Sequence, residues 1–214
     1  MPLTKREALP IVFRCAKQYQ KELVNHSLLF ICMDKHKRTY ALEVTFDVSN
    51  FLHLTGLRTR AQNISAGDFF QRCLDQRLSE DDFDFSDDGT TPFKLEVLPA
   101  LVSKNLSANM IGDYNGRQPK LITDKLAGSV RGCMGFKRVS NGKRYVPNTV
   151  LKGRTDDFTH NPDRIIITYR KSLPDRDYSE IVYAAKKLRW EDISLPEGYK
   201  NLPLPNAAAK SLNT

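Results

Sequence analysis

Residues 132–146 read GCMGFKRVSNGKRYV, and this stretch decides the fold class. Two runs with strand character, Gly132 to Val139 and Lys143 to Val146, flank Ser140-Asn141-Gly142. Asn-Gly between two such runs is the strongest short-range signal for a β-hairpin. Because successive side chains of a strand point to opposite faces, the first run has one mainly polar face and one partly apolar face. The stretch predicts an antiparallel hairpin in the second half of the chain.

Further strands are expected on the C-terminal side of this hairpin. Arg164 to Lys171 and Tyr178 to Ala184 have strand character and are joined by the turn Leu173-Pro174-Asp175. With the hairpin they predict a twisted antiparallel sheet of about four strands. The preceding half of the chain is mainly helical, so the expected fold class is α+β.

Three helices and a short hairpin are expected before this sheet. One helix runs from about Pro10 to Leu23, with apolar residues recurring every four positions. A second has Ser65 as N-cap, with Asp68 three residues on. A third starts at Thr91, and Pro99 should kink or split it. The short hairpin pairs Ser27 to Met33 with Thr39 to Phe46 around a charged turn.

Length and composition favour one domain. The chain has 214 residues, of which 40% are hydrophobic, which is enough for a substantial core. We expect a single α+β domain over residues 1–194 and a loosely ordered tail over residues 195–214, where Pro196, Pro203 and Pro205 precede three alanines.

Cysteine usage and apolar runs indicate a cytoplasmic protein, in the host cell if a phage encodes it. The four cysteines are far apart and include no C-x-x-C pair, so reduced and mostly buried thiols are expected, and no zinc site. No apolar run approaches the roughly 20 residues of a membrane span, and charges interrupt the N-terminus where a signal peptide would need an apolar segment. No membrane association is expected.

Positive charge is concentrated in the second half of the chain. The net charge is +8, made up of about −1 in residues 1–100 and about +9 in residues 101–214. Between Lys125 and Thr155 there is no acid and there are eight cations, which are Lys125, Arg131, Lys137, Arg138, Lys143, Arg144, Lys152 and Arg154. This distribution favours a polyanionic partner such as nucleic acid. The alternative is a solvated hairpin whose lysines protect an edge strand.

Three further residues are candidates for chemistry. On the strand from Arg164 to Lys171, Thr168 and Arg170 share the face that looks less like core, where they could contact a phosphate, although an ordinary amphipathic strand gives the same pattern. His53 lies between two leucines and is the best acid–base candidate, although a histidine in such a context is often a hydrogen-bonded core residue.

The acidic stretch from Glu80 to Gly89 suggests a calcium loop, because Asp84, Ser86, Asp88 and Gly89 match its opening positions. The twelfth position is Leu95, where such a loop needs a bidentate glutamate. We therefore expect a solvated turn, no metal site and no cofactor. Nucleotide-binding and hydrolase-triad motifs are also missing from the sequence.

Several short segments, in this order, together resemble the phage-associated Barnase, EndoU, colicin and RelE-like nucleases, specifically the fourth such group. They are Asn50-Phe51-Leu52-His53-Leu54-Thr55-Gly56-Leu57, Lys94-Leu95-Glu96-Val97-Leu98-Pro99, Ile111-Gly112-Asp113-Tyr114, Thr123-Asp124-Lys125-Leu126-Ala127-Gly128, Gly132-Cys133-Met134-Gly135-Phe136 and Val146-Pro147-Asn148-Thr149-Val150-Leu151-Lys152. The sequence departs from the family at Gly153-Arg154, where the family tends to have an acid.

The resemblance implies RNA cleavage without a bound metal, in which a ribose 2′-hydroxyl attacks the adjacent phosphate. His53 would then be the general acid or base. Lys152, Arg131 and Arg170 would offset phosphate charge, and Thr168 and Thr149 would donate hydrogen bonds. The predicted catalytic residues are therefore His53, Lys152, Thr168 and Arg170, and the predicted substrate-binding residues are Arg131, Lys137, Arg138, Asn148, Thr149 and Arg154.

The leading functional hypothesis is a metal-independent endoribonuclease acting as a toxin-like effector in conflict between phage and host. One alternative is a module that binds RNA or DNA without cutting it, which would need the cations but not His53. The other is a phage-encoded inhibitor whose basic face binds a host protein complex. The expected partners are accordingly RNA or DNA, and a protein inhibitor or host target.

Overall fold

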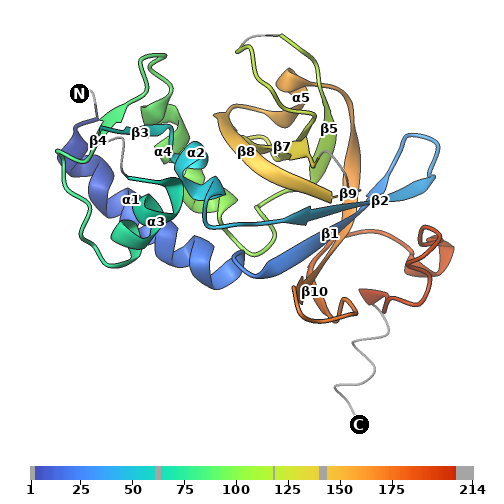
Figure 1. Cartoon of the computed structure of the whole chain (residues 1–214). Coiled ribbons are helices and arrows are strands. Elements are labelled where there is room, and N and C mark those ends of the chain that lie inside the picture. Colours follow the sequence, from blue (N-terminus) through green and yellow to red (C-terminus); the bar gives the residue numbers. More distant parts are fainter. Residues whose placement is uncertain (1–2, 61–63, 118, 140–143, 206–214) are drawn as a thin grey trace.

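The chain folds around a closed β-barrel, with helices α1 to α4 gathered at one end of the molecule (Figure 1). The computed structural model describes residues 3–60, 64–117, 119–139 and 144–205. The strands are β1 (His26–Met33), β2 (Thr39–Thr45), β3 (Leu57–Thr59), β4 (Phe83–Phe85), β5 (Met110–Tyr114), β6 (Lys125–Gly128), β7 (Gly132–Arg138), β8 (Arg144–Lys152), β9 (Thr159–Ser172) and β10 (Glu180–Ala184). The helices are α1 (Lys5–Glu22), α2 (Asn50–Thr55), α3 (Ala66–Leu74), α4 (Thr91–Leu101), α5 (Thr155–Phe158) and the 3₁₀ turn η1 (Trp190–Asp192).

Seven strands close the barrel in the order β1-β2-β8-β7-β6-β5-β9, and β9 returns to pair with β1. β10 adds an eighth strand on the outside of β9. The pairs are antiparallel except for β2 and β8, which run parallel over a two-residue register. The expected twisted antiparallel sheet of about four strands is therefore wrong: the sheet is mixed, larger and closed.

The missed strands explain this error. β5 and β6 are only five and four residues long, and neither has a clear apolar alternation. Closure depends on pairing Ser27 of β1 with Lys171 of β9, two residues far apart in the sequence. Local patterning carries no signal for such a pair. The β1–β2 hairpin, which the sequence predicted as a separate unit, is thereby one wall of the barrel.

Local sequence patterns nevertheless predicted the positions of several helices and strands. β1 and β2 lie where the apolar runs predicted them, and Ser65 and Asp68 form the expected capping box at the start of α3. β7 and β8 pair antiparallel as predicted, whereas the Asn-Gly turn between them lies outside the described residues. The expected split at Pro99 is wrong, since α4 continues to Leu101. Pro99 lies in the last turn of α4, so its missing N–H removes a single hydrogen bond, to the Leu95 carbonyl, close to the end of the helix.

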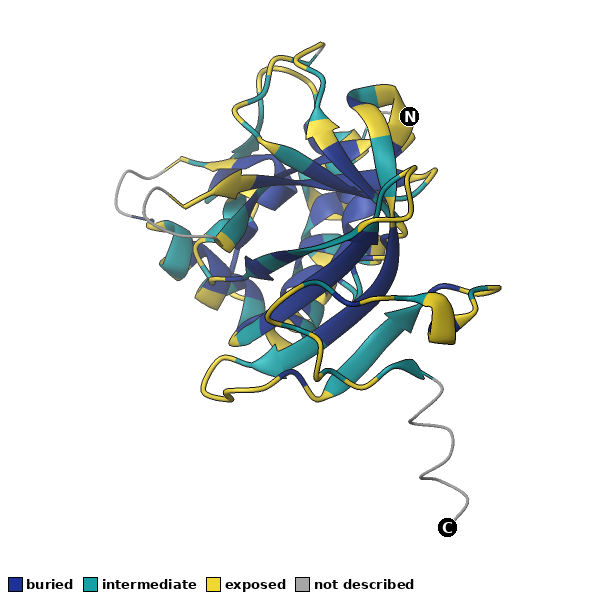
Figure 2. Cartoon of the chain, turned by 90° about the vertical axis from the view of Figure 1, so that its right-hand side faces the viewer, coloured by how far each residue is buried: buried dark blue, intermediate teal, exposed yellow. Residues whose placement is uncertain are grey.

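The strand β1 is buried on both faces, which accounts for its continuous apolar sequence. Leu28 and Phe30 belong to the main core with the helices, whereas Leu29 and Ile31 face a second cluster. That cluster includes Trp190 and Leu195, and the partly buried side chains of Leu195's C-terminal neighbours Tyr199, Leu202 and Leu204 pack against it. Of the segment that we expect to be loosely ordered, these last four side chains contact the barrel, and the boundary of the domain at residue 194 stays a prediction. The central strands are buried over most of their length (Figure 2).

No helix in the described ranges is both long enough and apolar enough to cross a membrane.

All four cysteines are buried and free, so we expect them to be chemically inert in the native protein. Burial raises the pKa of each thiol to about 12, so the reactive thiolate is scarce near neutral pH. At pH 8 a disulfide-exchange reagent should label none of them until guanidinium unfolds the chain, and all four afterwards. Fast labelling of any one in the native protein would contradict this burial.

Candidate active site

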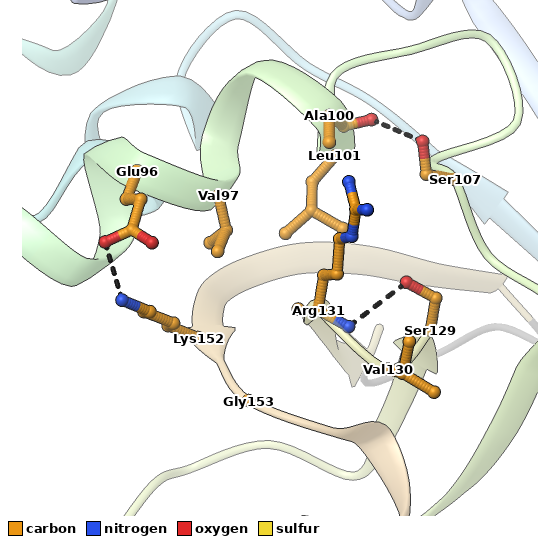
Figure 3. Close-up of a pocket in the computed structure, with 11 residues that line it drawn as sticks. Glu96, Val97, Ala100, Leu101, Ser107, Ser129, Val130, Arg131, Lys152 and Gly153 are labelled. Atoms are coloured by element: carbon orange, nitrogen blue, oxygen red, sulfur yellow. Dashed lines mark hydrogen bonds and ion pairs between the residues drawn. The ribbon is translucent and has the colours of Figure 1, made fainter.

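A cavity of about 570 Å³ opens where α4 faces the start of β7 and the end of β8 (Figure 3). It is the best candidate for an active site because it combines this volume with two of the predicted cations. Its lining comprises Glu96, Val97, Ala100, Leu101, Ser107, Ser129, Val130, Arg131, Gly132, Lys152 and Gly153.

One face of α4 forms a wall of the cavity. Glu96, Val97, Ala100 and Leu101 recur at the spacing of one helical face. Val97 is buried against the barrel, whereas Glu96 is exposed at the cavity. A Cβ atom added to Gly132 would lie 3.0 Å from the Val97 Cβ. The glycine therefore lets α4 approach β7 closely enough to close this side of the cavity.

Strand register brings the two cations to the same cavity. Gly132 of β7 pairs with Lys152 of β8, so Lys152 lies beside Arg131, the turn residue that directly precedes β7. The Gly153 backbone N–H donates to the Arg131 carbonyl oxygen at 3.2 Å, and the Thr155 N–H donates to the Ser129 carbonyl oxygen at 3.0 Å. These bonds tie the β6–β7 turn to the chain that leaves β8.

Charges sit on both sides of the cavity. Lys152 Nζ lies 2.7 Å from Glu96 Oε2 on one side, while Arg131 extends beside Leu101 on the other (Figure 3). Two cations and one carboxylate give the lining a net positive charge. Both members of the Lys152–Glu96 pair remain about half exposed, so a ligand can reach them. Lys152 Nζ also lies 5.6 Å from the centroid of the Phe93 ring.

This geometry can bind an anion. An ammonium and a guanidinium, both open to solvent, suit a phosphate group, and a neighbouring carboxylate can accept a proton.

A family model described as phage-Barnase-EndoU-ColicinE5/D-RelE like nuclease4 matches residues 11–187. The chain belongs to this nuclease family. All residues that line the cavity lie within the matched range. No curated protein and no solved structure matches the chain.

Three other predicted substrate-binding cations of this nuclease do not line the cavity. Lys137 and Arg138 end β7, roughly 20 Å along the strand from Gly132 at 3.3 Å per residue. Arg154 follows the lining residue Gly153, but its guanidinium binds the Asp156 carboxylate at 2.8 Å. The basic stretch is therefore divided between two ends of the barrel wall, and only one end has the cavity.

Asn148 and Thr149 lie midway along β8. The Asn148 side-chain amide donates to the Ile122 carbonyl oxygen at 2.5 Å, and its Oδ1 accepts from the Thr123 hydroxyl at 3.1 Å. Thr149 is 5% exposed, and its hydroxyl has no hydrogen-bond partner among the described residues. Asn148 thus fastens a loop to the barrel, and substrate binding by either residue stays a prediction.

Thr168 and Arg170 lie on β9 and face the main core, because they pair with Phe30 and Leu28 of β1. The Thr168 hydroxyl is fully buried, with no hydrogen-bond partner in the described structure. Arg170 binds carboxylates from α1 and β10, with Glu22 at 3.1 Å and Glu180 at 2.6 Å. The structure does not bring them to the cavity lining, and their catalytic roles remain untested predictions.

His53 is exposed on α2, whose Phe51, Leu54 and Thr55 side chains are buried. It is therefore not the core histidine that its leucine neighbours also allowed. Helix α2 contacts both β8 and α4, the two elements that supply Lys152 and Glu96 (Figure 1). His53 does not line the cavity, and its role as acid or base stays a prediction.

Two residues that line the cavity, Glu96 and Ser129, were not predicted as site residues from the sequence. Glu96 entered only as part of a segment that resembles the family, although it is the one acid within α4. Its spacing would have predicted its place better, because it lies on the same helical face as Val97, Ala100 and Leu101. Ser129 is in the tight turn just before Arg131, and its hydroxyl accepts from the Arg131 backbone N–H at 3.5 Å.

The acidic stretch lies elsewhere, and basic side chains engage it. Arg60 and Lys5 bind the Asp84 carboxylate at 2.6 and 2.7 Å, and these bonds hold its pKa well below the usual range. Arg72 binds Asp82 at 2.9 Å. Among the described residues, no group of three or more His, Cys, Asp or Glu is arranged to hold a metal ion.

Proposed function

We propose that this nuclease is an endoribonuclease that cleaves RNA in the α4–β8 cavity without a metal ion. In this reaction a ribose 2′-hydroxyl attacks the adjacent phosphate. The observation that carries the proposal is the convergence of Arg131, Lys152 and Glu96 on one open cavity. RNA is favoured over DNA because the carboxylate can activate a hydroxyl that DNA lacks. The toxin-like role expected from the sequence depends on this activity and is part of the same proposal.

Arg131 and Lys152 serve to stabilise charge on the phosphate. An ammonium group has three N–H donors, of which Lys152 uses one on Glu96, so two remain for phosphate oxygens. Arg131 adds a planar guanidinium that can bind two oxygens at once. Stabilisation of developing charge is commonly the largest contribution to such a reaction.

Glu96 is our candidate for the base that takes the proton from the 2′-hydroxyl. Its carboxylate lines the cavity, beside the lysine that would hold the phosphate. The 5′ oxygen that leaves must gain a proton, and His53 remains the candidate donor on the neighbouring helix α2. Two proton transfers are then divided between two helices that border β8.

Side chains rather than a metal ion would offset phosphate charge here, since the cavity contributes two cations and one ion-paired carboxylate.

To test the proposed cleavage, purified protein is incubated in excess EDTA with a labelled single-stranded RNA and with DNA of the same sequence. We expect the RNA to be cut and the DNA to stay intact.

Other outcomes point to the alternatives. RNA that is bound but never cut, with or without added magnesium, would replace the nuclease reaction with a binding function. Cutting only after magnesium is restored would overturn the metal-free mechanism. If neither nucleic acid binds, a pull-down from nuclease-treated host lysate tests the remaining alternative, in which a host protein is the target.

A further inference from the structure

Phe93 is an aromatic side chain that the fold leaves uncovered beside the cavity. It is 55% exposed, whereas seven of the other ten phenylalanines are at most 3% exposed. An aromatic ring that stays in water does not gain the free energy of burial, so the exposure of Phe93 needs an explanation. Among the large hydrophobic residues that are exposed in the described structure, Phe93 is the sole aromatic one.

The position of Phe93 on α4 connects it to the cavity. It precedes Glu96 by three residues and Val97 by four, so it continues the helical face that forms the cavity wall. Lys152 Nζ lies 5.6 Å from the centre of its ring. The ring therefore flanks the ammonium group that, in the proposed reaction, holds the phosphate.

A ring beside a phosphate-binding lysine has the chemistry to stack on a nucleobase. In a nucleotide one sugar separates the phosphate from the base, so a phosphate held at Lys152 brings a neighbouring base towards Phe93. Every base has a flat π face, and stacking on an aromatic side chain is tolerant of sequence. Bases in a duplex are covered by their neighbours, whereas single strands can present an open face.

We propose that Phe93 stacks on a base next to the bound phosphate, and that the site takes single-stranded RNA with little base preference. This inference rests on the proposed function, because it assumes that RNA occupies the cavity. The interaction with Lys152 does not account for the exposure, since more than half of the residue stays open to solvent. A base stacked there would cover it.

The test measures binding rather than cleavage, so that it stands apart from the proposed reaction. The ligand is a short 2′-O-methyl RNA, which lacks the attacking hydroxyl and cannot be cut by the proposed route. Replacing Phe93 with alanine should weaken binding about 10-fold, whereas tryptophan should preserve it. Leu173→Ala, which removes an exposed apolar side chain outside the cavity, is the matched control and should leave the Kd unchanged.

An abasic scan separates stacking from a purely structural effect on Lys152. Removing the base that Phe93 contacts should weaken wild-type binding about as much as Phe93→Ala does, and should add little to the loss in that variant. If the two losses add fully at every position, Phe93 acts without a base and the proposal is overturned. A Phe93→Leu variant that binds like the wild type would overturn it too.

The preference for single-stranded RNA is tested by a separate measurement. A duplex of the same sequence should bind the wild type about as weakly as the single strand binds Phe93→Ala. Equal affinity for duplex and single strand would contradict the proposal. If the single strand binds with the predicted Phe93 dependence but unmodified RNA is never cut, the stacking proposal survives and the proposed cleavage fails.

Discussion

Replacing Lys152 with alanine should slow RNA cleavage by about 10²–10³-fold, the usual effect of removing one group that stabilises charge in the transition state. Lys152 is one of two cations in the cavity, and its Nζ is 2.7 Å from the carboxylate that we propose as the base. Without it, Glu96 would face the phosphate with no compensating charge beside it. The measurement is the single-turnover rate on labelled RNA.

The matched control is Lys17→Ala, which removes one exposed lysine from α1 and should leave the rate unchanged. Lys152→Arg keeps the charge but alters its shape and donors, so we expect an intermediate rate. Circular dichroism should show that the variants are folded. A folded Lys152→Ala protein that cuts RNA within threefold of the wild-type rate would remove this cavity from the mechanism.

Replacing Gly128 with alanine should lower the free energy of unfolding by on the order of 3 kcal/mol. A Cβ atom there would lie 2.5 Å from the Cys133 Cα and 2.6 Å from its Cβ, so the clash is largely with backbone. β6 and β7 are joined by the three residues after Gly128, which include Ser129 and Arg131. Moving β7 to relieve the clash would therefore displace the cavity as well.

Thermal unfolding measures this effect, with an expected fall in Tm of roughly 10 °C for a chain of this size. Gly67→Ala is the matched control, because a Cβ atom in that helical position meets nothing nearer than 3.8 Å. It should stabilise the protein by about 0.5 kcal/mol. Equal Tm values for the Gly128 and Gly67 variants would contradict the close packing of β6 on β7.

The elements that were predicted from the sequence are those that depend on nearby residues. The capping box of Ser65 and Asp68 forms within one turn, and the apolar run of β1 reflects burial on both faces of that strand. The closure of the barrel depends instead on pairing β1 with β9. Closure also needs short strands such as β6, whose local sequence is as compatible with a loop as with a strand.

The same division holds for the candidate site. Arg131 and Lys152 were predicted because an acid-free basic stretch is visible in the sequence itself. Glu96 was not, since a glutamate on a short helix is usually solvated, and its pairing with Lys152 exists only once α4 packs on the barrel. Arg170 shows the converse: its charge suggested phosphate binding, and in the fold it binds Glu22 and Glu180.

The chemical ends of the RNA products test the proposed 2′-hydroxyl attack most directly. Mass spectrometry of the products formed in excess EDTA should show a 2′,3′-cyclic phosphate on one fragment and a 5′-hydroxyl on the other. Those ends arise only when the 2′-hydroxyl attacks its own phosphate. Products with a 3′-hydroxyl and a 5′-phosphate would mean that water is the nucleophile, and would contradict the mechanism assigned to Glu96, Arg131 and Lys152.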